Sequence, residues 1–532
     1  MSFTYGSGTE LDPYQVWTAT DLDNVRNYLS SHFIQMADID LSGQYWIPIG
    51  SKNTAIISDF FEGNFNGNNF KISNLTIDTR INVPYSDFIG LFSYSKNASV
   101  INITLEDVNI IYGYRNVGAL VGACIDTIFD NCLINGDVYG YDACVSLLCG
   151  FTRGCNINNV EVRGNITATY GSLGGIIGTA DSYNSGGEMY EDTILNDVHA
   201  DIIITTEYGD GIGGLVGWND EGNLIISRCS ATGVLNGGND EIGGLVGYSR
   251  RYADLRLTQS YANVEVNGSG YSTGGLVGEA WIKSTNPNSY IKNCYARGIV
   301  NGGVYGTGGL IGMTDFPIEN CYSTGLVQGS SDIGGLIGDY YGSSIINCYY
   351  DSETSGQSDT GKGIPKTTLE MTYPYSDLDN IYIDWVFYDD ENYVWVHDKD
   401  TYEYDITRII TDSDFIIDTC TVYGADRAFC EYRYLASIFY QSVSYDGVTM
   451  IFGENDVTSY IKVVGGVTYL PVRVIAQDLY NLRVIWSELN YQVLLFGCVD
   501  GTINDGYPHF IKPSKLIHRI LIPITGGTIV YL

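Results

Sequence analysis

The sequence predicts a mainly β fold: a right-handed parallel β-helix solenoid followed by a small α+β C-terminal domain. Three features predict the solenoid. Glycine-framed apolar cores recur along the chain, a column of Asn and Cys residues follows them, and the short apolar runs show no helical period. Such runs read as short strands joined by tight turns, and parallel β connections favour the right hand.

Each core has two glycines, two branched apolar residues and a closing glycine. From Gly150 to Gly338 the closing glycines recur in steps of 28, 39, 30, 31, 34 and 26 residues, which fits one coil per repeat with variable insertions. Their leucines are expected to form one interior column. The full copies are Gly174–Gly178, Gly213–Gly217, Gly243–Gly247, Gly274–Gly278, Gly308–Gly312 and Gly334–Gly338; looser copies are Gly90–Ser93, Gly118–Gly122 and Leu147–Gly150; the leucines are Leu215, Leu245, Leu276, Leu310 and Leu336.

The second column predicts a corner followed by a strand. Asn tolerates the left-handed backbone that a corner needs, and stacked Asn side chains can bond from coil to coil, so we place Asn293, Asn320 and Asn347 at corners. Period-two alternation beyond the corner turns the next residue inward and the following Tyr outward. The inward column is Cys229, Ser260, Cys294, Cys321 and Cys348.

The twelve cysteines are predicted to be reduced. Neighbouring parallel strands lie about 4.8 Å apart, whereas the Cβ atoms of a disulfide prefer about 3.5–4.5 Å, so stacked thiols are favoured over bridges. A metal site on these sulfurs is disfavoured, because several ligands would have to converge and no Cys-x-x-Cys pair is present.

Tyr295, Tyr322 and Tyr349 are the candidate binding residues. As outward neighbours of the inward column they would form a stripe along one flank, where aromatic faces can stack on the sugars of a glycan. The alternative is cross-rung stacking that only stiffens the coil.

The repeat resembles that of the GLUG-motif proteins, which occur among bacterial surface proteins and phage proteins. The resemblance extends to Ala37–Leu41 with Trp46–Gly50 before the repeats, to a first full coil at Phe61–Leu75, and to a closing segment at Pro365–Met371. It covers about residues 14–400 and implies a right-handed parallel β-helix.

Both ends of a solenoid need covers, because a bare terminal coil exposes an open edge. Thr20 is expected to cap a short N-terminal helix, with Leu22, Val25 and Leu29 facing inward. Residues 373–396 are expected to close the other end.

The chain changes character near its C-terminal end. A strand around residues 466–470, a helix begun by Pro471 and a hairpin are expected there. Leu470–Arg473 and Trp486 resemble the small domain named after the N-terminal region of copper amine oxidases, over about residues 445–497. Copper chemistry is not implied, because the chain has no His-x-His ligand pair; we expect a structural or attachment domain.

The predicted domain organisation has five parts. They are residues 1–50 as the N-terminal cap and its lead-in segment, 51–350 as the β-helix, 351–405 as the closing segment, 406–440 as a linker or small connector, and 441–532 as the copper amine oxidase-like α+β domain.

Composition limits the partners. With 27 basic and 62 acidic residues the formal charge is −35, which disfavours nucleic acid. No apolar stretch is long enough for membrane insertion, and the N-terminus does not read as a signal peptide. No cofactor is expected, although Asp351, Glu353 and Asp359 could supply calcium ligands.

No catalytic residue is predicted. The five histidines are scattered without an HExxH pattern, and no GxSxG elbow is present. Acidic pairs such as Asp220 with Glu221 or Asp240 with Glu241 fit loop solvation, so the chain is not expected to be an enzyme.

The leading functional prediction is a non-enzymatic structural or adhesive protein: a bacteriophage virion fibre, appendage or decoration protein that presents its surface to a host cell or glycan. Expected partners are other virion or cell-surface proteins and a host glycan, and a homo-oligomer is expected. Localisation would be the virion. The alternatives are a secreted bacterial cell-surface adhesin and a β-helical polysaccharide depolymerase.

Overall fold

The structure is a computed structural model of the chain. It describes residues 3–371, apart from residues 51–59, 82–86, 143, 182–189, 250–252, 283–287, 343 and 369. Beyond residue 371 it describes the strands β40 to β50 without their side chains. The chain divides into two compact units, one that includes all residues up to 371 and one that includes these later strands.

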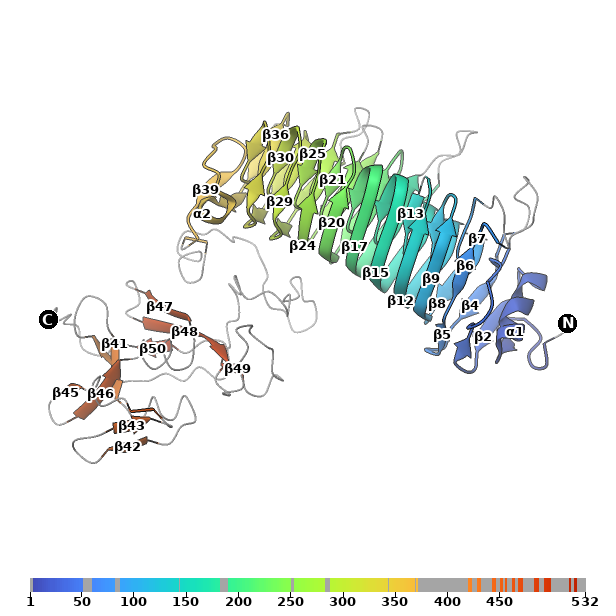
Figure 1. The fold of residues 1–532 in the computed structure, drawn as a ribbon, viewed down its shortest axis with the longest axis horizontal. Coiled ribbons are helices and arrows are strands. Elements are labelled where there is room, and N and C mark those ends of the chain that lie inside the picture. Colours follow the sequence, from blue (N-terminus) through green and yellow to red (C-terminus); the bar gives the residue numbers. More distant parts are fainter. Residues whose placement is uncertain are drawn as a thin grey trace. The chain divides into compact units, whose positions relative to one another are not determined.

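The first unit is the predicted mainly β, parallel β-solenoid, with about nine turns (Figure 1). One wall is a sheet of nine parallel strands, each beginning within or just after a glycine core, so a core marks one coil as predicted. These strands are β7 (Phe92–Lys96), β11 (Val121–Ile125), β14 (Cys149–Arg153), β16 (Ile177–Asp181), β18 (Val216–Asn219), β22 (Val246–Ser249), β26 (Val277–Ala280), β31 (Ile311–Thr314) and β36 (Ile337–Tyr340).

The remaining strands of the unit form one continuous sheet of thirty parallel strands that wraps the other sides. In chain order its members up to β17 are β1 (Tyr14–Val16), β2 (His32–Gln35), β3 (Ile39–Asp40), β4 (Asn64–Asn66), β5 (Lys71–Ser73), β6 (Thr76–Asp78), β8 (Ser99–Ile101), β9 (Thr104–Gly113), β10 (Val117–Gly118), β12 (Ile128–Gly140), β13 (Cys144–Ser146), β15 (Asn156–Gly174) and β17 (Thr193–Gly213). The later members are β19 (Asn223–Ser227), β20 (Ser230–Gly237), β21 (Ile242–Gly243), β23 (Asp254–Thr258), β24 (Tyr261–Asn267), β25 (Tyr271–Gly274), β27 (Tyr290–Lys292), β28 (Tyr295–Ala296), β29 (Val300–Asn301), β30 (Tyr305–Gly308), β32 (Ile318–Glu319), β33 (Tyr322–Ser323), β34 (Val327–Gln328), β35 (Ile333–Gly334), β37 (Ile345–Ile346), β38 (Tyr349–Asp351) and β39 (Ile364–Lys366).

Register explains why the repeat needs its glycines. Like residues are direct partners in successive coils, as in Val246 with Val277, so equivalent glycines lie beside one another. A Cβ on Gly275 would stand 2.1 Å from the carbonyl oxygen of Gly309, which no side chain can occupy. The predicted leucine column is fully buried in the interior, with Leu215, Leu245, Leu276, Leu310 and Leu336 all 0% exposed.

The Asn corners are confirmed. Asn293, Asn320 and Asn347 have φ of 54°, 51° and 51°, in the left-handed region. Asn320 Nδ2 donates to Asn293 Oδ1, and Asn347 Nδ2 donates to Asn320 Oδ1, both at 3.2 Å. The same column bends the same way at Arg228 and Gln259, so position in the coil sets this conformation even where Asn is missing.

The cysteine column is confirmed as reduced and interior. Cys229, Cys294, Cys321 and Cys348 are all unbridged and at most 1% exposed, and Ser260 is equally buried. Burial is the largest cause that raises the pKa of the Cys321 thiol, and a hydrogen bond with Cys294 raises it further. The Cys321 thiol is therefore a neutral core side chain.

The N-terminal cap differs from its prediction at the residue that begins the helix. Helix α1 (Ala19–Asn24) is capped by Thr18, not Thr20. The Thr18 side chain accepts a hydrogen bond from the Asp21 backbone N–H, and the Asp21 carboxylate accepts one from the Thr18 backbone N–H. Leu22 and Val25 are fully buried as expected. The 3₁₀ turn η1 (Val25–Asn27) follows.

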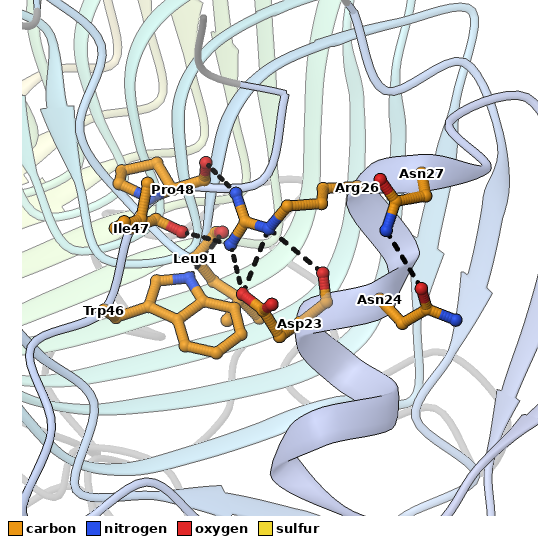
Figure 2. A network of polar contacts seen from close by, with 8 residues as sticks. All are labelled: Asp23, Asn24, Arg26, Asn27, Trp46, Ile47, Pro48 and Leu91. Atoms are coloured by element: carbon orange, nitrogen blue, oxygen red, sulfur yellow. Dashed lines mark hydrogen bonds and ion pairs between the residues drawn. The ribbon is translucent and has the colours of Figure 1, made fainter. Parts of the chain in front are cut away.

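Arg26 joins this cap to the lead-in segment (Figure 2). Its Nη2 donates to Ile47 O at 2.8 Å and its Nη1 donates to Pro48 O at 3.2 Å, while the guanidinium also contacts Asp23. The neighbouring Trp46 is buried and its Nε1 donates to Leu91 O at 3.1 Å. One side chain thus satisfies two carbonyls of a non-helical segment.

The C-terminal end of the solenoid carries the short helix α2 (Ser352–Ser355), and β39 pairs with β38. The expected closing segment at residues 373–396 lies outside the described residues. No helix of the described part is long and apolar enough to cross a membrane.

The second unit contains antiparallel strands. The predicted strand near residue 467 and the predicted hairpin are present, as β46 and as β47 paired with β48. Pro471, which was expected to begin a helix, is instead the last residue of β46, and the rest of that predicted helix falls outside the described residues. The five-part domain division stays a prediction. The strands are β40 (Cys420–Val422), β41 (Ala428–Glu431), β42 (Val443–Tyr445), β43 (Met450–Phe452), β44 (Asn455–Asp456), β45 (Lys462–Val464), β46 (Val467–Pro471), β47 (Arg483–Ser487), β48 (Gln492–Cys498), β49 (Leu516–Ile517) and β50 (Leu521–Pro523).

Candidate functional site

The predicted tyrosine stripe is mostly covered. Tyr295 and Tyr322 are 3% and 4% exposed, and Tyr349 is half-buried. The rings of Tyr261, Tyr295 and Tyr322 stack with centroids 4.9 Å apart and planes 3° apart. This distance matches the spacing of parallel strands, because in-register neighbours place identical rings face to face.

Arg297 covers the same stack. Its guanidinium carbon lies 4.7 Å from the centroid of the Tyr295 ring, and its Nη2 donates to Tyr322 Oη at 3.1 Å. The expectation of an exposed stripe is therefore wrong at Tyr295 and Tyr322, because their faces are occupied by one another and by Arg297. The arrangement supports the alternative of cross-rung stiffening, and a glycan contact at this column stays a prediction.

A second tyrosine column is exposed, and the sequence analysis did not identify it. Tyr141, Tyr170 and Tyr208 are 38%, 42% and 46% exposed. Ring centroids are 6.0 Å apart from Tyr114 to Tyr141, 6.0 Å from Tyr141 to Tyr170 and 5.4 Å from Tyr170 to Tyr208. We call Tyr114, Tyr141, Tyr170 and Tyr208 the tyrosine ladder.

The ladder combines stacked and edge-on pairs. The Tyr114–Tyr141 and Tyr170–Tyr208 pairs are stacked, whereas Tyr141 meets Tyr170 at 77°. It therefore presents ring edges and hydroxyl groups along four successive coils, with a polar atom and an apolar edge at each step. A sequence signal for it exists, since each of these tyrosines precedes a closing glycine by eight or nine residues.

The charges beside the ladder change along its length. At the Tyr114 end, the Arg115 guanidinium lies 5.2 Å from the Tyr114 ring and Arg115 Nε donates to Asp142 at 3.3 Å. At the other end the neighbours are acidic. A hydrogen bond from Tyr208 to Glu207 holds the pKa of the tyrosine above its ordinary value.

Carboxylates also gather near the corner before strand β22. Burial, followed by the charges of Glu279, Asp240 and Asp210, raises the pKa of Glu241 to about 8. Its backbone has φ of 56°, as the left-handed corner requires. The sequence analysis assigned Asp240 with Glu241 to loop solvation; the structure instead places Glu241 partly buried among other acids.

Aromatic side chains accompany these carboxylates on the outer face of the nine-stranded sheet. Glu279 on β26 accepts hydrogen bonds from Ser272 Oγ at 2.5 Å and from Trp281 Nε1. On β36, Asp339 accepts from Tyr341 Oη at 2.7 Å. The Trp281 and Tyr341 ring centroids are 5.4 Å apart, so a mixed aromatic and acidic face spans several coils.

The three residues proposed for calcium are held by donors of the chain itself. Asp351 is fully buried, caps α2 through the Glu353 and Thr354 N–H groups, and accepts from Thr368 Oγ1 at 2.7 Å. Asp359 Oδ1 accepts from Gly335 N at 2.8 Å. Within the described residues no group of three metal-ligating side chains converges. Calcium binding stays a prediction.

No family model matches the chain. The resemblances to the GLUG-motif proteins and to the copper amine oxidase N-terminal domain are therefore not shown and stay predictions.

Two curated proteins are similar to parts of the chain. A protein of Evansella cellulosilytica, named as a candidate Gly-rich membrane protein, is 37% identical over 131 residues, which is 23% of this chain and 14% of that protein. Halomucin of Haloquadratum walsbyi is 27% identical over 211 residues, which is 32% of this chain and 2% of that protein. The chain thus spans a small part of the length of either relative.

Two solved structures are also similar. One is an IgA1 protease, with a TM-score of 0.39 and 19% identity, covering 52% of this chain and 21% of its own. The other is a candidate immunoglobulin A1 protease of Bacteroides ovatus, with a TM-score of 0.37 and 18% identity, covering 72% of this chain and 91% of its own.

The names of these structures contradict one expectation. The chain was not expected to be an enzyme, but both similar structures are named as proteases, and we withdraw that expectation. The similarity does not assign protease activity to this chain.

Proposed function

We propose that the solenoid is a cell-surface scaffold that binds an extended glycan along the tyrosine ladder. The exposure of Tyr141, Tyr170 and Tyr208 carries this proposal, because rings exposed by 38–46% on successive coils are free to contact a linear polymer. A surface location is supported by the relative named as a Gly-rich membrane protein. Stacked coils suit this role, since a rigid row of contacts loses little conformational entropy on binding.

The test is binding of purified protein to insoluble cell-wall polysaccharides, measured by co-sedimentation. The triple variant Tyr141→Ala, Tyr170→Ala, Tyr208→Ala should weaken binding at least tenfold. A matched control replaces three exposed tyrosines outside the ladder, with 57%, 45% and 37% exposure, and should bind like the parent; these are Tyr5, Tyr45 and Tyr290. Equal loss in both triple variants, or no binding by the parent, would refute the proposal.

A virion appendage would use the same scaffold and the same surface. The prediction of a virion fibre, appendage or decoration protein rests on the sequence alone, and the curated relatives favour a cell surface instead. Mass spectrometry of purified phage particles and of cell envelopes separates the two locations.

A polysaccharide depolymerase is the second candidate function. One observation favours it: Glu241, with a pKa of about 8, would stay protonated at neutral pH next to Glu279, as a general acid must. Release of new reducing ends from cell-wall glycans should then be lost in Glu241→Gln and kept in Glu10→Gln, a change at an exposed site. Absence of product from the parent protein on every glycan that it binds would remove this candidate.

A further inference from the structure

The tyrosine ladder is interrupted after Tyr208. In the next coil Asn239 takes the corresponding place: its backbone N–H donates to Gly209 O at 2.8 Å, and its Nδ2 donates to Tyr208 O at 3.3 Å. Among the described residues, the aromatic contact of Tyr208 is its stack on Tyr170. One face of the Tyr208 ring stacks on Tyr170, and the other face is directed toward the next coil, which has Asn239 and no aromatic ring at this position.

The surroundings of this gap are acidic. Glu207 is exposed next to Tyr208, and Asp240 follows Asn239 directly. Asp210 lies close to Asp240. Burial raises the pKa of Asp210, a backbone hydrogen bond from Asp240 lowers it, and the charge of Asp240 raises it. In the part of the chain that the structure describes, none of these three carboxylates forms an ion pair, and residues 164–227 contain no Lys or Arg.

We propose that this gap, bounded by Tyr208, Glu207 and Asp240, is a subsite for the ammonium group of an amino-sugar polymer lying along the ladder. The inference rests on the proposed glycan function of the ladder. An ammonium group over a tyrosine face gains a cation–π contact. Glu207 and Asp240 have no ion-pair partner among the described residues, although Asp240 Oδ1 accepts a hydrogen bond from Tyr271 N at 2.7 Å, and their charges add Coulomb attraction. A glycan with carboxylates or sulfates would be repelled at the same place.

Asn239 offers a direct test, because its side chain is exposed. Asn239→Tyr fills the gap and continues the ladder without changing its tyrosines. Affinities for oligomers of glucosamine, of N-acetylglucosamine and of a uronic acid, all of equal length, are measured by isothermal titration calorimetry at low and high salt.

The parent is expected to bind the glucosamine oligomer about tenfold more tightly than its acetylated form at low salt, with the difference reduced at high salt. Asn239→Tyr and the double variant Glu207→Gln, Asp240→Asn should each remove this difference. The double variant should also leave binding of the acetylated oligomer unchanged, because that oligomer carries no ammonium group.

The outcomes separate the two proposals. Equal affinity for the charged and acetylated oligomers overturns the ammonium subsite and leaves glycan binding in place. The ammonium subsite is also overturned if both variants still prefer the glucosamine oligomer. It is overturned as well if an oligolysine of equal charge binds as tightly as the glucosamine oligomer. Failure of every oligosaccharide to bind overturns both the subsite and the proposed function.

Discussion

At the scale of single residues, the position of a residue in the coil determines its backbone conformation, whatever the residue type. The corner column is left-handed at Asn293, Asn320 and Asn347, where the residue tolerates it, and also at Arg228 and Gln259. At Asn320 the side-chain amide also links three coils, because it donates to Asn293 and accepts from Asn347.

Two substitutions of Asn320 separate these contributions. Asn320→Gly keeps the conformation and loses two amide bonds, so it should cost about 1–2 kcal/mol of unfolding free energy. Asn320→Ala also forces an L side chain to keep φ near 51° and should cost about 1 kcal/mol more. Urea unfolding measures both, and an alanine variant as stable as the glycine variant would contradict the strain argument.

Glu241 should make stability fall as pH rises. Its pKa is about 8 in the folded protein against an ordinary value of 4.5, so the folded state binds the proton more tightly. The stabilisation is fully present below pH 4.5 and is lost as pH rises toward 8. Thermal unfolding should show Glu241→Gln more stable than the parent at pH 8, by an amount on the order of a few kcal/mol.

The exposed variant Glu10→Gln is the control and should follow the parent across this range. If Glu241→Gln does the same, Glu241 is not held protonated by burial and by its acidic neighbours. That result would also weaken the depolymerase candidate, which depends on the same proton.

At the scale of elements, the N-terminal cap shows which contacts determine where a short helix begins and what holds it on the solenoid. Thr18 rather than Thr20 begins α1, because the reciprocal bonds with Asp21 decide between two threonines of similar propensity. The helix is too short to be stable alone, and Leu22 and Val25 hold it on the first coils. The carbonyl contacts of Arg26 then attach the lead-in segment to it.

Arg26→Lys should loosen this end of the solenoid only. A lysine has one ammonium group and cannot reach Ile47 O and Pro48 O as a planar fork does. Hydrogen exchange should accelerate in residues 19–49 and stay unchanged in later coils, since each coil contacts only its neighbours. Arg163→Lys, at an exposed pair with Glu161 on the same strand, is the control. Acceleration throughout the solenoid in Arg26→Lys would contradict a local role.

At the scale of the whole solenoid, stability depends on the distance between coils. In the full cores before the last one, the second glycine lies against the carbonyl of the equivalent glycine one coil on, as Gly275 does with Gly309. The same repetition places like side chains in rows, which produces the buried stack at Tyr295 and the exposed ladder at Tyr141.

Gly275→Ala should disrupt the stacking of coils. Its Cβ would meet Gly309 O at 2.1 Å and the Cβ of Ala296 at 2.9 Å, and both neighbours are held by their own coils. We expect a loss of more than about 3 kcal/mol, measured by urea unfolding. Gly43→Ala is the control: no atom lies within 4 Å of its new Cβ, so only the strain of φ at 77° remains, about 1 kcal/mol. Similar losses in the two variants would show that close coil approach does not limit stability.

The sequence by itself determined the coil. Glycines in fixed order, the corner Asn column and the interior column of Leu and Cys follow from steric and alternation rules that act within one repeat, and all three are present. The residue that caps α1 was predicted wrongly, because Thr18 and Thr20 both satisfy the local preference for a threonine at the start of a helix.

Only the tertiary structure decided which surface is exposed. Tyr295 alternates outward as predicted from the strand period, yet the tyrosine rings of the coils before and after it cover its two faces. Rules that act within one repeat cannot predict a contact with the neighbouring repeats. The ladder at Tyr141, Tyr170 and Tyr208 arises from residues at slightly different distances from their cores, and the register shift between Gly171 and Leu173 allows Tyr170 and Tyr208 to be direct partners. Exposure depends on contacts between coils, and these exist only after the chain has wound.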